Sequence, residues 1–103
     1  MPREQRYERT LAEEIARVRI EIWTDRGRVT MFVVQLEAWH LGRWKPVRRY
    51  DTAHGQPHLD ILDIMGRTID KQWLRQSSNE ALTVAIDDIK RNWRRHLAEF
   101  EGR

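Results

Sequence analysis

Between residues 17 and 23, apolar and polar side chains alternate with a period of two. The apolar members of this segment are Val18, Ile20 and Ile22. Such alternation predicts a β-strand with one buried face. A loop at 24–28 follows, and its Gly27 can adopt the positive φ of a tight turn. Because residues 29–39 are rich in β-branched and aromatic residues, the two segments together predict a β-hairpin.

The second strand of this hairpin has apolar residues on both faces, with the purer set at the even positions. We therefore expect residues 29–39 to lie centrally in a sheet. A third strand is predicted over residues 44–50, where Pro46 cannot donate a ladder hydrogen bond and indicates an edge position or a bulge. The apolar stretch 59–65 predicts a fourth strand, and residues 68–74 fit either a strand or a short helix.

The C-terminal part of the chain has helical periodicity. Ser77 and Glu80 have the spacing of a capping box, and Gly102 can terminate the helix. The apolar residues at helical intervals are Leu82, Ile86, Ile89, Trp93, Leu97 and Phe100. His96 lies beside this stripe, and we expect it to be a helix-end residue. The sequence thus predicts an α+β fold, in which an antiparallel meander of about four strands packs against a long C-terminal helix.

The N-terminal segment gives weaker signals. Residues 1–9 are polar, and we expect them to be loose. Thr10 and Glu13 have capping-box spacing, which favours a short helix that begins just after Thr10, with Leu11 and Ile15 on one face. The length of 103 residues, with no linker or repeat, indicates one domain over residues 1–103.

The composition excludes several classes of protein. Without Cys there is no disulfide framework, thiolate nucleophile or Cys-ligated metal. The apolar runs are too short to span a bilayer, and acidic residues interrupt any signal peptide, so we expect a cytoplasmic protein without membrane contact. The net charge of +3 arises entirely from residues 41–103, because residues 1–40 carry seven basic and seven acidic side chains.

Residues 47–60 bring two Arg, a Tyr, two Asp and two His together where a strand runs into a loop. RNA cleavage needs a base for the 2′-hydroxyl, an acid for the leaving oxygen and cations for the developing phosphorane charge. His54 and His58 titrate near neutrality and suit both proton transfers. Asp51 would orient one imidazole. This chemistry requires no metal and no cofactor.

Basic and aromatic residues alternate just before this loop. The set comprises Arg43, Trp44, Lys45, Arg48, Arg49 and Tyr50, with no acidic residue among them. Phosphate cations interleaved with stacking faces suit single-stranded nucleic acid. We expect Arg48 or Arg49 to hold a phosphate by a bidentate contact. The alternative is an edge strand whose charges prevent pairing with other chains.

Two other interpretations use the same loop. His54 and His58, with Asp51 or Asp60, could ligate a metal, and a metal-dependent hydrolase would lose activity with a chelator. However, the glycine and proline between the histidines argue against the helix on which their spacing would be specific. In the structural interpretation, Asp51 caps a turn and both histidines are ordinary loop residues.

The sequence also resembles a known family. The string Arg49-Tyr50-Asp51, a Gly-containing loop, His58 and a Leu-rich helix with Asp87-Asp88-Ile89 resemble TumE-type toxins of bacterial toxin–antitoxin pairs. Within the similar part, residues 44–93, Thr52 stands where that pattern usually has Asn, and Asp60 replaces a further His. The resemblance implies an RNA-directed toxin that a cognate antitoxin neutralises. The Tyr-Asp-Thr-Ala-His-Gly string at 50–55 also resembles an uncharacterised bacterial and archaeal domain family.

We therefore expect an RNA-acting, toxin-like protein, a metal-independent ribonuclease whose partners are RNA and an antitoxin. The rival expectation is a non-catalytic interaction module, in which the mixed face of residues 29–39 or the helix stripe packs against a partner chain. A domain of this size buries only about two-thirds of its unfolded surface, which favours a homo-oligomer.

Overall fold

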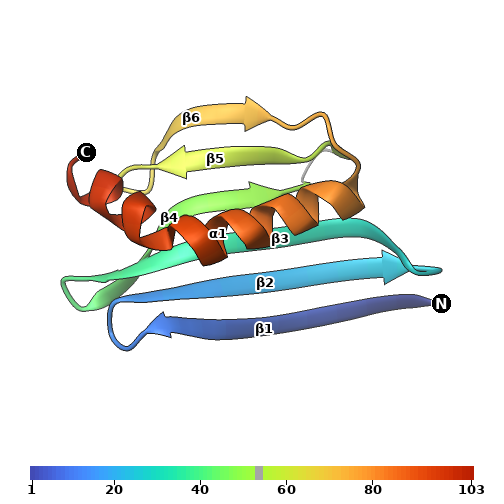
Figure 1. The fold of residues 1–103 in the computed structure, drawn as a ribbon, viewed down its shortest axis with the longest axis horizontal. Helices are drawn as coiled ribbons and strands as arrows, with labels where there is room; N and C mark the ends of the chain where they lie inside the picture. Colours follow the sequence, from blue (N-terminus) through green and yellow to red (C-terminus); the bar gives the residue numbers. More distant parts are fainter. Residues whose placement is uncertain (53–54) are drawn as a thin grey trace.

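The computed structural model describes residues 1–52 and 55–103. Over these residues the protein has an α+β fold, with one six-stranded antiparallel sheet and a C-terminal helix (Figure 1). The strands are β1 (Pro2–Ala12), β2 (Ala16–Asp25), β3 (Arg28–His40), β4 (Arg43–Asp51), β5 (His58–Leu62) and β6 (Thr68–Trp73), and the helix is α1 (Ser78–Glu101). The strands lie in the sheet in their order along the chain, which confirms the predicted meander.

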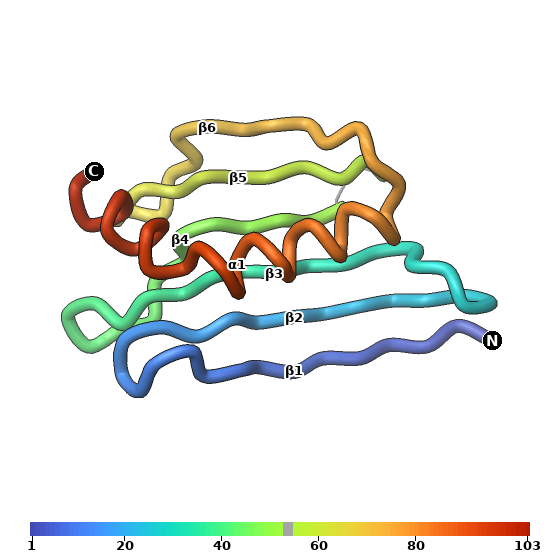
Figure 2. Tube along the Cα trace, in the orientation of Figure 1, coloured from blue at the N-terminus to red at the C-terminus, as the bar shows by residue number. Residues whose placement is uncertain are grey.

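Two of the hairpins close through two-residue turns that end in glycine. Arg26 and Gly27 connect β2 to β3 with φ values of 53° and 78°, and Leu41 and Gly42 connect β3 to β4 with 49° and 79°. Positive φ at both central residues defines the type I′ turn, whose twist matches that of paired strands. The tube in Figure 2 shows the resulting path, in which successive strands run back and forth.

The strand predicted to be central does lie inside the sheet. β3 pairs with β2 along one side and with β4 along the other. The register of the second pair shifts between Leu36, opposite Arg48, and Glu37, opposite Pro46, so that Val47 is the extra residue. Pro46 therefore lies at a β-bulge, which was one of its two predicted positions.

The prediction of about four strands is wrong, because the sheet has a further strand at each edge. β1 includes the segment expected to be loose and the start of the expected short helix, and it pairs with β2 from Pro2↔Asp25 to Ala12↔Ala16. β6, the segment with two interpretations, pairs with β5. Both edge strands are almost wholly exposed. Apolar and polar residues therefore need not alternate in these strands. Pairing through backbone hydrogen bonds does not depend on residue type, so it produces no pattern that the sequence would reveal.

The helix begins at the predicted capping box. The backbone N–H of Glu80 donates to Ser77 Oγ at 3.2 Å, and the Ser77 hydroxyl donates to Glu80 Oε1 at 2.8 Å. The buried residues of α1 are Ala81, Ala85, Ile89, Trp93, His96, Leu97 and Phe100. Leu82 and Ile86 are only partly buried, so the buried stripe is rotated slightly from the predicted one. None of the helical structure in the described residues has the length and apolarity that a membrane span requires.

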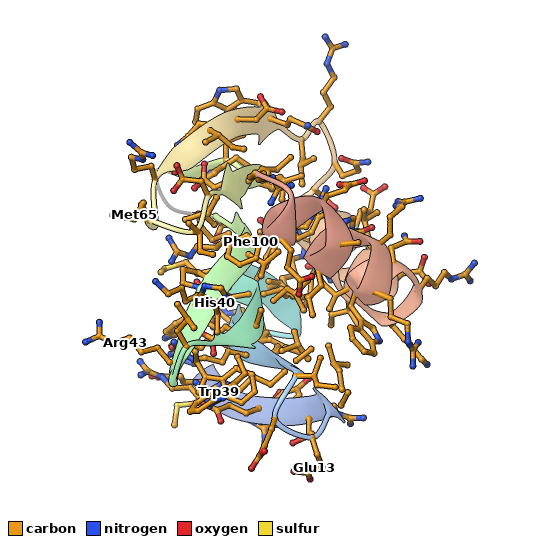
Figure 3. The ribbon with its side chains drawn as sticks, turned by 90° about the vertical axis from the view of Figure 1, so that its left-hand side faces the viewer. Glu13, Trp39, His40, Arg43, Met65 and Phe100 are labelled. Atoms are coloured by element: carbon orange, nitrogen blue, oxygen red, sulfur yellow. The ribbon has the colours of Figure 1, made fainter. Side chains whose placement is uncertain are left out.

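The helix lies on one face of the sheet, across β3 and β4 (Figures 1 and 3). The core between the two layers includes Val18, Ile20, Phe32, Val34, Leu36 and Leu59 from the sheet, packed against the buried residues of α1. Successive side chains of a strand point to opposite faces. The strand side chains that alternate with these core residues therefore lie on the opposite face of the sheet. No helix among the described residues covers that face, and we call it the open face.

We predict that Phe100→Ala lowers the free energy of unfolding by about 3–5 kcal/mol, because it leaves a cavity where a large side chain is buried. Phe100 is 1% exposed and packs in the last turn of α1. Urea unfolding followed by circular dichroism measures the loss. The control Leu41→Ala, at a turn residue that is 88% exposed, should stay within about 0.5 kcal/mol of the parent. Equal stability of the two variants would contradict this account of the core.

Candidate functional site

The open face carries two rows of mostly polar side chains that cross all six strands. Residues directly opposite each other in antiparallel strands share a face. One row contains Glu8, Arg19, Gln35, Arg49, Asp60 and Lys71, and the next contains Arg6, Glu21, Val33, Asp51, His58 and Trp73. Four members of these rows are buried: Gln35, Asp51, His58 and Asp60. Since no helix covers them, the long side chains around them must exclude the solvent.

Three of these buried residues, Asp51, His58 and Asp60, form what we call the Asp-His-Asp cluster. His58 Nε2 lies 3.0 Å from Asp51 Oδ1 and 3.5 Å from Asp60 Oδ2. The other ring nitrogen, Nδ1, lies 3.3 Å from the backbone carbonyl oxygen of Gln56. One ligand atom from each of the three residues lies within 4.8 Å of the others. An imidazole and two carboxylates at this spacing are able to hold a metal ion.

Two side chains of the edge strand β6 lie over this cluster. The ring of Trp73 is 5.2 Å from that of His58, tilted by 57°. Lys71 Nζ lies 3.5 Å from Asp60 Oδ1 and 5.6 Å from the centre of the Trp73 ring. Both residues are exposed. A ligand could therefore reach the cluster after these two side chains change rotamer, without movement of the core.

A chain of hydrogen bonds links the cluster's neighbour Arg49 to β2. Arg49 Nε donates to Gln35 Oε1 at 2.7 Å, and Gln35 Nε2 donates to Glu37 Oε2. Arg17 Nε donates to the other oxygen of Glu37 at 2.6 Å. Arg17 and Arg19 both pair with carboxylates, whereas Arg49 has no carboxylate partner among the described residues. Its guanidinium is thus held by a neutral amide and suits an added anion.

A hollow of about 290 Å³ lies on the open face beside the cluster. Its lining residues are Arg19, Glu21, Val33, Gln35, Arg49 and Asp51. Asp51 therefore contributes both to this hollow and to the contact with His58. His58 itself is only 2% exposed and does not line the hollow. A molecule bound in the hollow would meet Arg49 and Asp51 directly and His58 through Asp51.

The tryptophans differ widely in burial. Trp93 is in the core, but Trp39 and Trp73 are 43% and 53% exposed. Trp44, a member of the basic and aromatic set expected to contact nucleic acid, is partly buried. Its ring contacts that of Trp39 edge-on at 5.3 Å and lies beneath the Arg17 guanidinium at 4.3 Å. Aromatic rings are thus present at both ends of the open face, one pair near Arg17 and one ring near the cluster.

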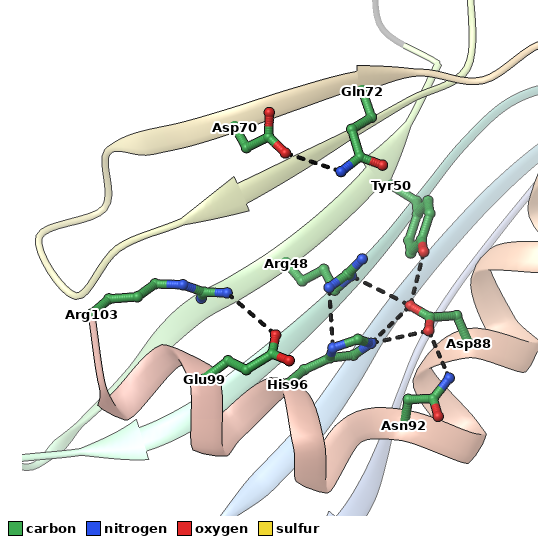
Figure 4. A network of polar contacts seen from close by, with 9 residues as sticks. All are labelled: Arg48, Tyr50, Asp70, Gln72, Asp88, Asn92, His96, Glu99 and Arg103. Carbon is green, nitrogen blue, oxygen red and sulfur yellow. Dashed lines mark hydrogen bonds and ion pairs between the residues drawn. The ribbon is translucent and has the colours of Figure 1, made fainter.

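A second polar cluster lies between the sheet and α1 (Figure 4). Tyr50 Oη donates to Asp88 Oδ2 at 2.8 Å, and Asn92 Nδ2 donates to Asp88 Oδ1 at 2.9 Å. His96 Nε2 is 3.0 Å from both carboxylate oxygens, and Arg48 Nη1 is 3.1 Å from His96 Nδ1. Because a guanidinium can only donate, Nδ1 accepts, and Nε2 carries the proton that it donates to Asp88. His96, expected to be a helix-end residue, is therefore a buried link between strand and helix.

The environment of this second cluster shifts two pKa values in opposite directions. Burial raises the pKa of Tyr50 to about 12, and the hydrogen bond and negative charge of Asp88 add to the effect. Burial also acts to raise the pKa of Asp88. Hydrogen bonds from His96, Asn92 and Tyr50 outweigh it and hold the pKa of this carboxyl well below its usual range. The fold thus favours an ionised Asp88 beside a neutral Tyr50.

The structure separates the residues that the sequence grouped together. Asp51 and His58 are in contact, whereas His54 lies outside the described residues. Of the two arginines expected to hold phosphate, Arg49 lies on the open face and Arg48 pairs with Asp88 beneath α1. Tyr50, expected at the nucleic-acid surface, is buried in the same polar cluster as Arg48.

The remaining basic candidate, Lys45, is tied to the backbone. Its Nζ donates to the carbonyl oxygen of Ile64 at 3.1 Å. Sequence reasoning missed Lys71 and Trp73, which lie over the cluster, because they belong to a strand it did not assign. Once residues 68–73 are known to pair with β5, the register Asp60↔Lys71 and His58↔Trp73 places both beside the cluster.

We predict that Asp88→Asn lowers the free energy of unfolding by about 2–4 kcal/mol at neutral pH, because Arg48 loses its buried counter-charge. The pKa of Asp88 is lowered on folding, so its stabilising effect is complete above the ordinary pKa of Asp and is lost as the pH falls below it. The difference between parent and variant should therefore shrink between about pH 5 and about pH 2. Urea unfolding at a series of pH values measures it.

The matched control is Asp87→Asn, at an exposed neighbouring carboxylate that pairs with the exposed Arg91. This variant should differ little from the parent at any pH. An Asp88→Asn variant whose stability deficit is the same at low and neutral pH would contradict the role given to the Asp88 charge.

Comparison with known proteins places the whole chain in one family. No curated protein and no solved structure matches it. The sequence profile of the family described as "Domain of unknown function (DUF7718)" matches residues 1–103. The match therefore includes all six strands, α1 and both polar clusters. The chain belongs to the DUF7718 family.

Proposed function

We propose that this protein acts on single-stranded RNA, and that the open face of its sheet is the RNA-binding surface. The observation that carries the proposal is the hollow in which Arg49, held by an amide and without a carboxylate partner among the described residues, lies beside Asp51 of the Asp-His-Asp cluster. A cation for phosphate next to a group that can accept a proton supplies two of the three functions that RNA cleavage needs.

The aromatic side chains of this face suit unpaired bases. Trp73 lies over the cluster, and Trp39 with Trp44 lies at the opposite end of β3 and β4. Base stacking on such rings contributes about 1–3 kcal/mol per base without reading the sequence. Exposed rings on an open sheet, with arginine between them, form the kind of platform on which single strands bind.

The charge of the face limits where phosphates would bind. The arginines of β1 and β2 on this face are engaged by Glu4, Glu8, Glu21 and Glu37. Phosphate contacts would therefore concentrate at Arg49 and at Lys71, whose ammonium group can turn from Asp60 toward an added anion. We infer a short site of a few nucleotides, centred on the cluster.

In the reaction, Asp51 is the member of the cluster that would contact the RNA. His58 is too buried to do so, and its 3.0 Å contact with Asp51 would position that carboxylate. The metal-independent form of this chemistry, with His54 as a second proton-transfer group, remains a prediction. The similarity of residues 44–93 to TumE-type toxins supports a toxin-like role with an antitoxin as partner.

We predict that Arg49→Gln weakens binding of a fluorescent single-stranded RNA by about tenfold, since it removes one phosphate contact. The slope of log affinity against log salt concentration should fall by about 0.7, the value for one phosphate on a single strand. Fluorescence anisotropy at several salt concentrations measures both. Arg95→Gln, on the exposed side of α1, makes the same change in charge and should leave both values unaltered.

Equal loss of affinity in the two arginine variants would show that only net charge matters and would overturn the assigned surface. A parent protein that self-associates in light scattering, yet shows no salt-dependent RNA affinity, would favour the interaction-module interpretation. In that case the exposed edge strands and their apolar side chains, such as Ile69 and Tyr7, would be the surfaces to examine.

We predict that Asp51→Asn reduces ribonuclease activity at least about 100-fold, because the amide cannot accept a proton. Growth inhibition on expression should be lost in parallel. Cleavage of a labelled RNA by purified protein measures the first effect, and colony counts measure the second. The control Asp70→Asn, at an exposed carboxylate of β6, should keep full activity. Undiminished cleavage by a folded Asp51→Asn protein would rule out the proposed centre.

A further inference from the structure

We propose that the Asp-His-Asp cluster binds a divalent transition-metal ion through Asp51, His58 and Asp60. The three side chains converge from two adjacent strands, with Asp51 at the end of β4 directly opposite His58 at the start of β5. Their ligand atoms lie within 4.8 Å of one another, and all three residues are buried. This inference does not depend on the proposed function, because the protein would bind the ion without RNA.

The orientation of the His58 ring leaves Nε2 in a position to ligate a metal ion. A backbone carbonyl can only accept, so the contact with Gln56 requires His58 Nδ1 to carry a proton. In the neutral ring the lone pair is then on Nε2, the atom that faces the two carboxylates. Histidines that ligate metals characteristically donate their other N–H to such a carbonyl, which fixes the tautomer.

The two distances from His58 to the carboxylates also fit one ion. His58 Nε2 is 3.0 Å from Asp51 Oδ1 and 3.5 Å from Asp60 Oδ2. Ligands about 2.1 Å from a common ion lie roughly 3.0–3.4 Å from each other in octahedral or tetrahedral geometry. A lone pair directed at two carboxylate oxygens would be repelled by both, so the arrangement calls for a positive charge, either on the ring or on a bound ion. A metal ion would meet all three atoms at once, whereas a proton on Nε2 can be directed at only one oxygen.

Asp60 provides an independent reason to expect a cation. This residue is 7% exposed, and its Oδ1 is buried without a hydrogen-bond partner among the described residues. Its nearest cation, Lys71 Nζ, is 3.5 Å away on a side chain that is 43% exposed. A buried carboxylate oxygen without a hydrogen bond is costly. A metal ion would satisfy the carboxylate and release Lys71 toward solvent or toward an anionic ligand.

The donor set selects the class of metal. One imidazole with two carboxylates suits Mn²⁺, Fe²⁺ or Zn²⁺ better than Ca²⁺, which prefers oxygen ligands alone. Three protein ligands leave coordination positions for water or substrate, as in catalytic sites. The ion would thus be held beside the hollow that Arg49 lines. If RNA is cleaved here, a metal-bound water would take part in the chemistry.

The experiment measures binding of Mn²⁺ and of Zn²⁺ to tag-free protein by isothermal titration calorimetry, with thermal unfolding in parallel. We expect one equivalent of ion to bind and to raise Tm, because the folded state alone assembles the ligands. Asp60→Asn should weaken binding at least about tenfold, since even changes outside the ligand set have effects of that size. The matched control is Asp70→Asn, which lies next to Lys71 in β6 and opposite Ile61, and it should bind as the parent does.

A second measurement keeps the test decisive if Asp60→Asn does not fold. In the parent protein, Zn²⁺ should shift the Nε2 resonance of His58 in ¹⁵N NMR while Nδ1 stays protonated. Absence of binding by the parent, equal binding by the Asp60→Asn and Asp70→Asn variants, or an unchanged His58 ring would each overturn the proposal. Metal binding without RNA cleavage would refute the proposed function alone, and RNA cleavage without metal binding would refute this inference alone.

Discussion

The alternation of side chains along β3, and along β4 after its bulge at Val47, is the constraint on which the rest of the structure depends. Both strands lie inside the sheet, so each residue faces either α1 or the open face. On β3, even-numbered residues such as Val34 and Leu36 enter the core, and odd-numbered residues such as Gln35 and Glu37 form the polar rows. On β4 the same rule sends Arg48 and Arg49 to opposite sides of the sheet. One layer of backbone thus separates a packing surface from a polar surface.

The open face is polar, yet several of its side chains are shielded from solvent because neighbouring side chains cover them. Glu37 is 4% exposed without a helix above it, since Arg17 and Gln35 both donate to its carboxylate. Arginine stems are apolar and can shield groups beneath them while their guanidinium groups stay in water. The fold therefore keeps a low-dielectric environment around Asp51 and His58 without closing the surface. Electrostatic interactions are stronger in such surroundings than in bulk water.

The sequence was sufficient to predict the elements whose burial leaves a periodic pattern. Residues 16–25, 28–40 and 78–101 each have one buried side, and the predictions for them were confirmed apart from small shifts in their limits. The edge strands were not predictable in this way, because neither side of β1 or β6 is buried. The Pro46 bulge was inferred correctly because a missing N–H is a local property that does not depend on the partner strand.

The candidate site was only partly predictable for a related reason. Contact between Asp51 and His58 requires a register between β4 and β5, which depends on the loop that joins them and not on residue type. The separation of Arg48 from Arg49, in contrast, follows from the period of two and was available from the sequence. Asp88 and His96 are helical residues two turns apart, so their shared face could have been recognised. Their partners Arg48 and Tyr50 could not have been recognised from the sequence, since they belong to the sheet and not to the helix.

The two polar clusters differ in a way that indicates which one the fold requires. Beneath α1, the Arg48 and Asp88 charges are of opposite sign, and Tyr50, Asn92 and a neutral His96 complete the hydrogen bonds, so the group joins helix to sheet. On the open face, two buried carboxylates meet one histidine and one half-exposed lysine. That group brings two buried carboxylates close together, and within residues 1–52 and 55–103 it holds no second layer in place. Burial of like charges opposes folding, and a feature that the fold does not need is best explained by a ligand that it binds.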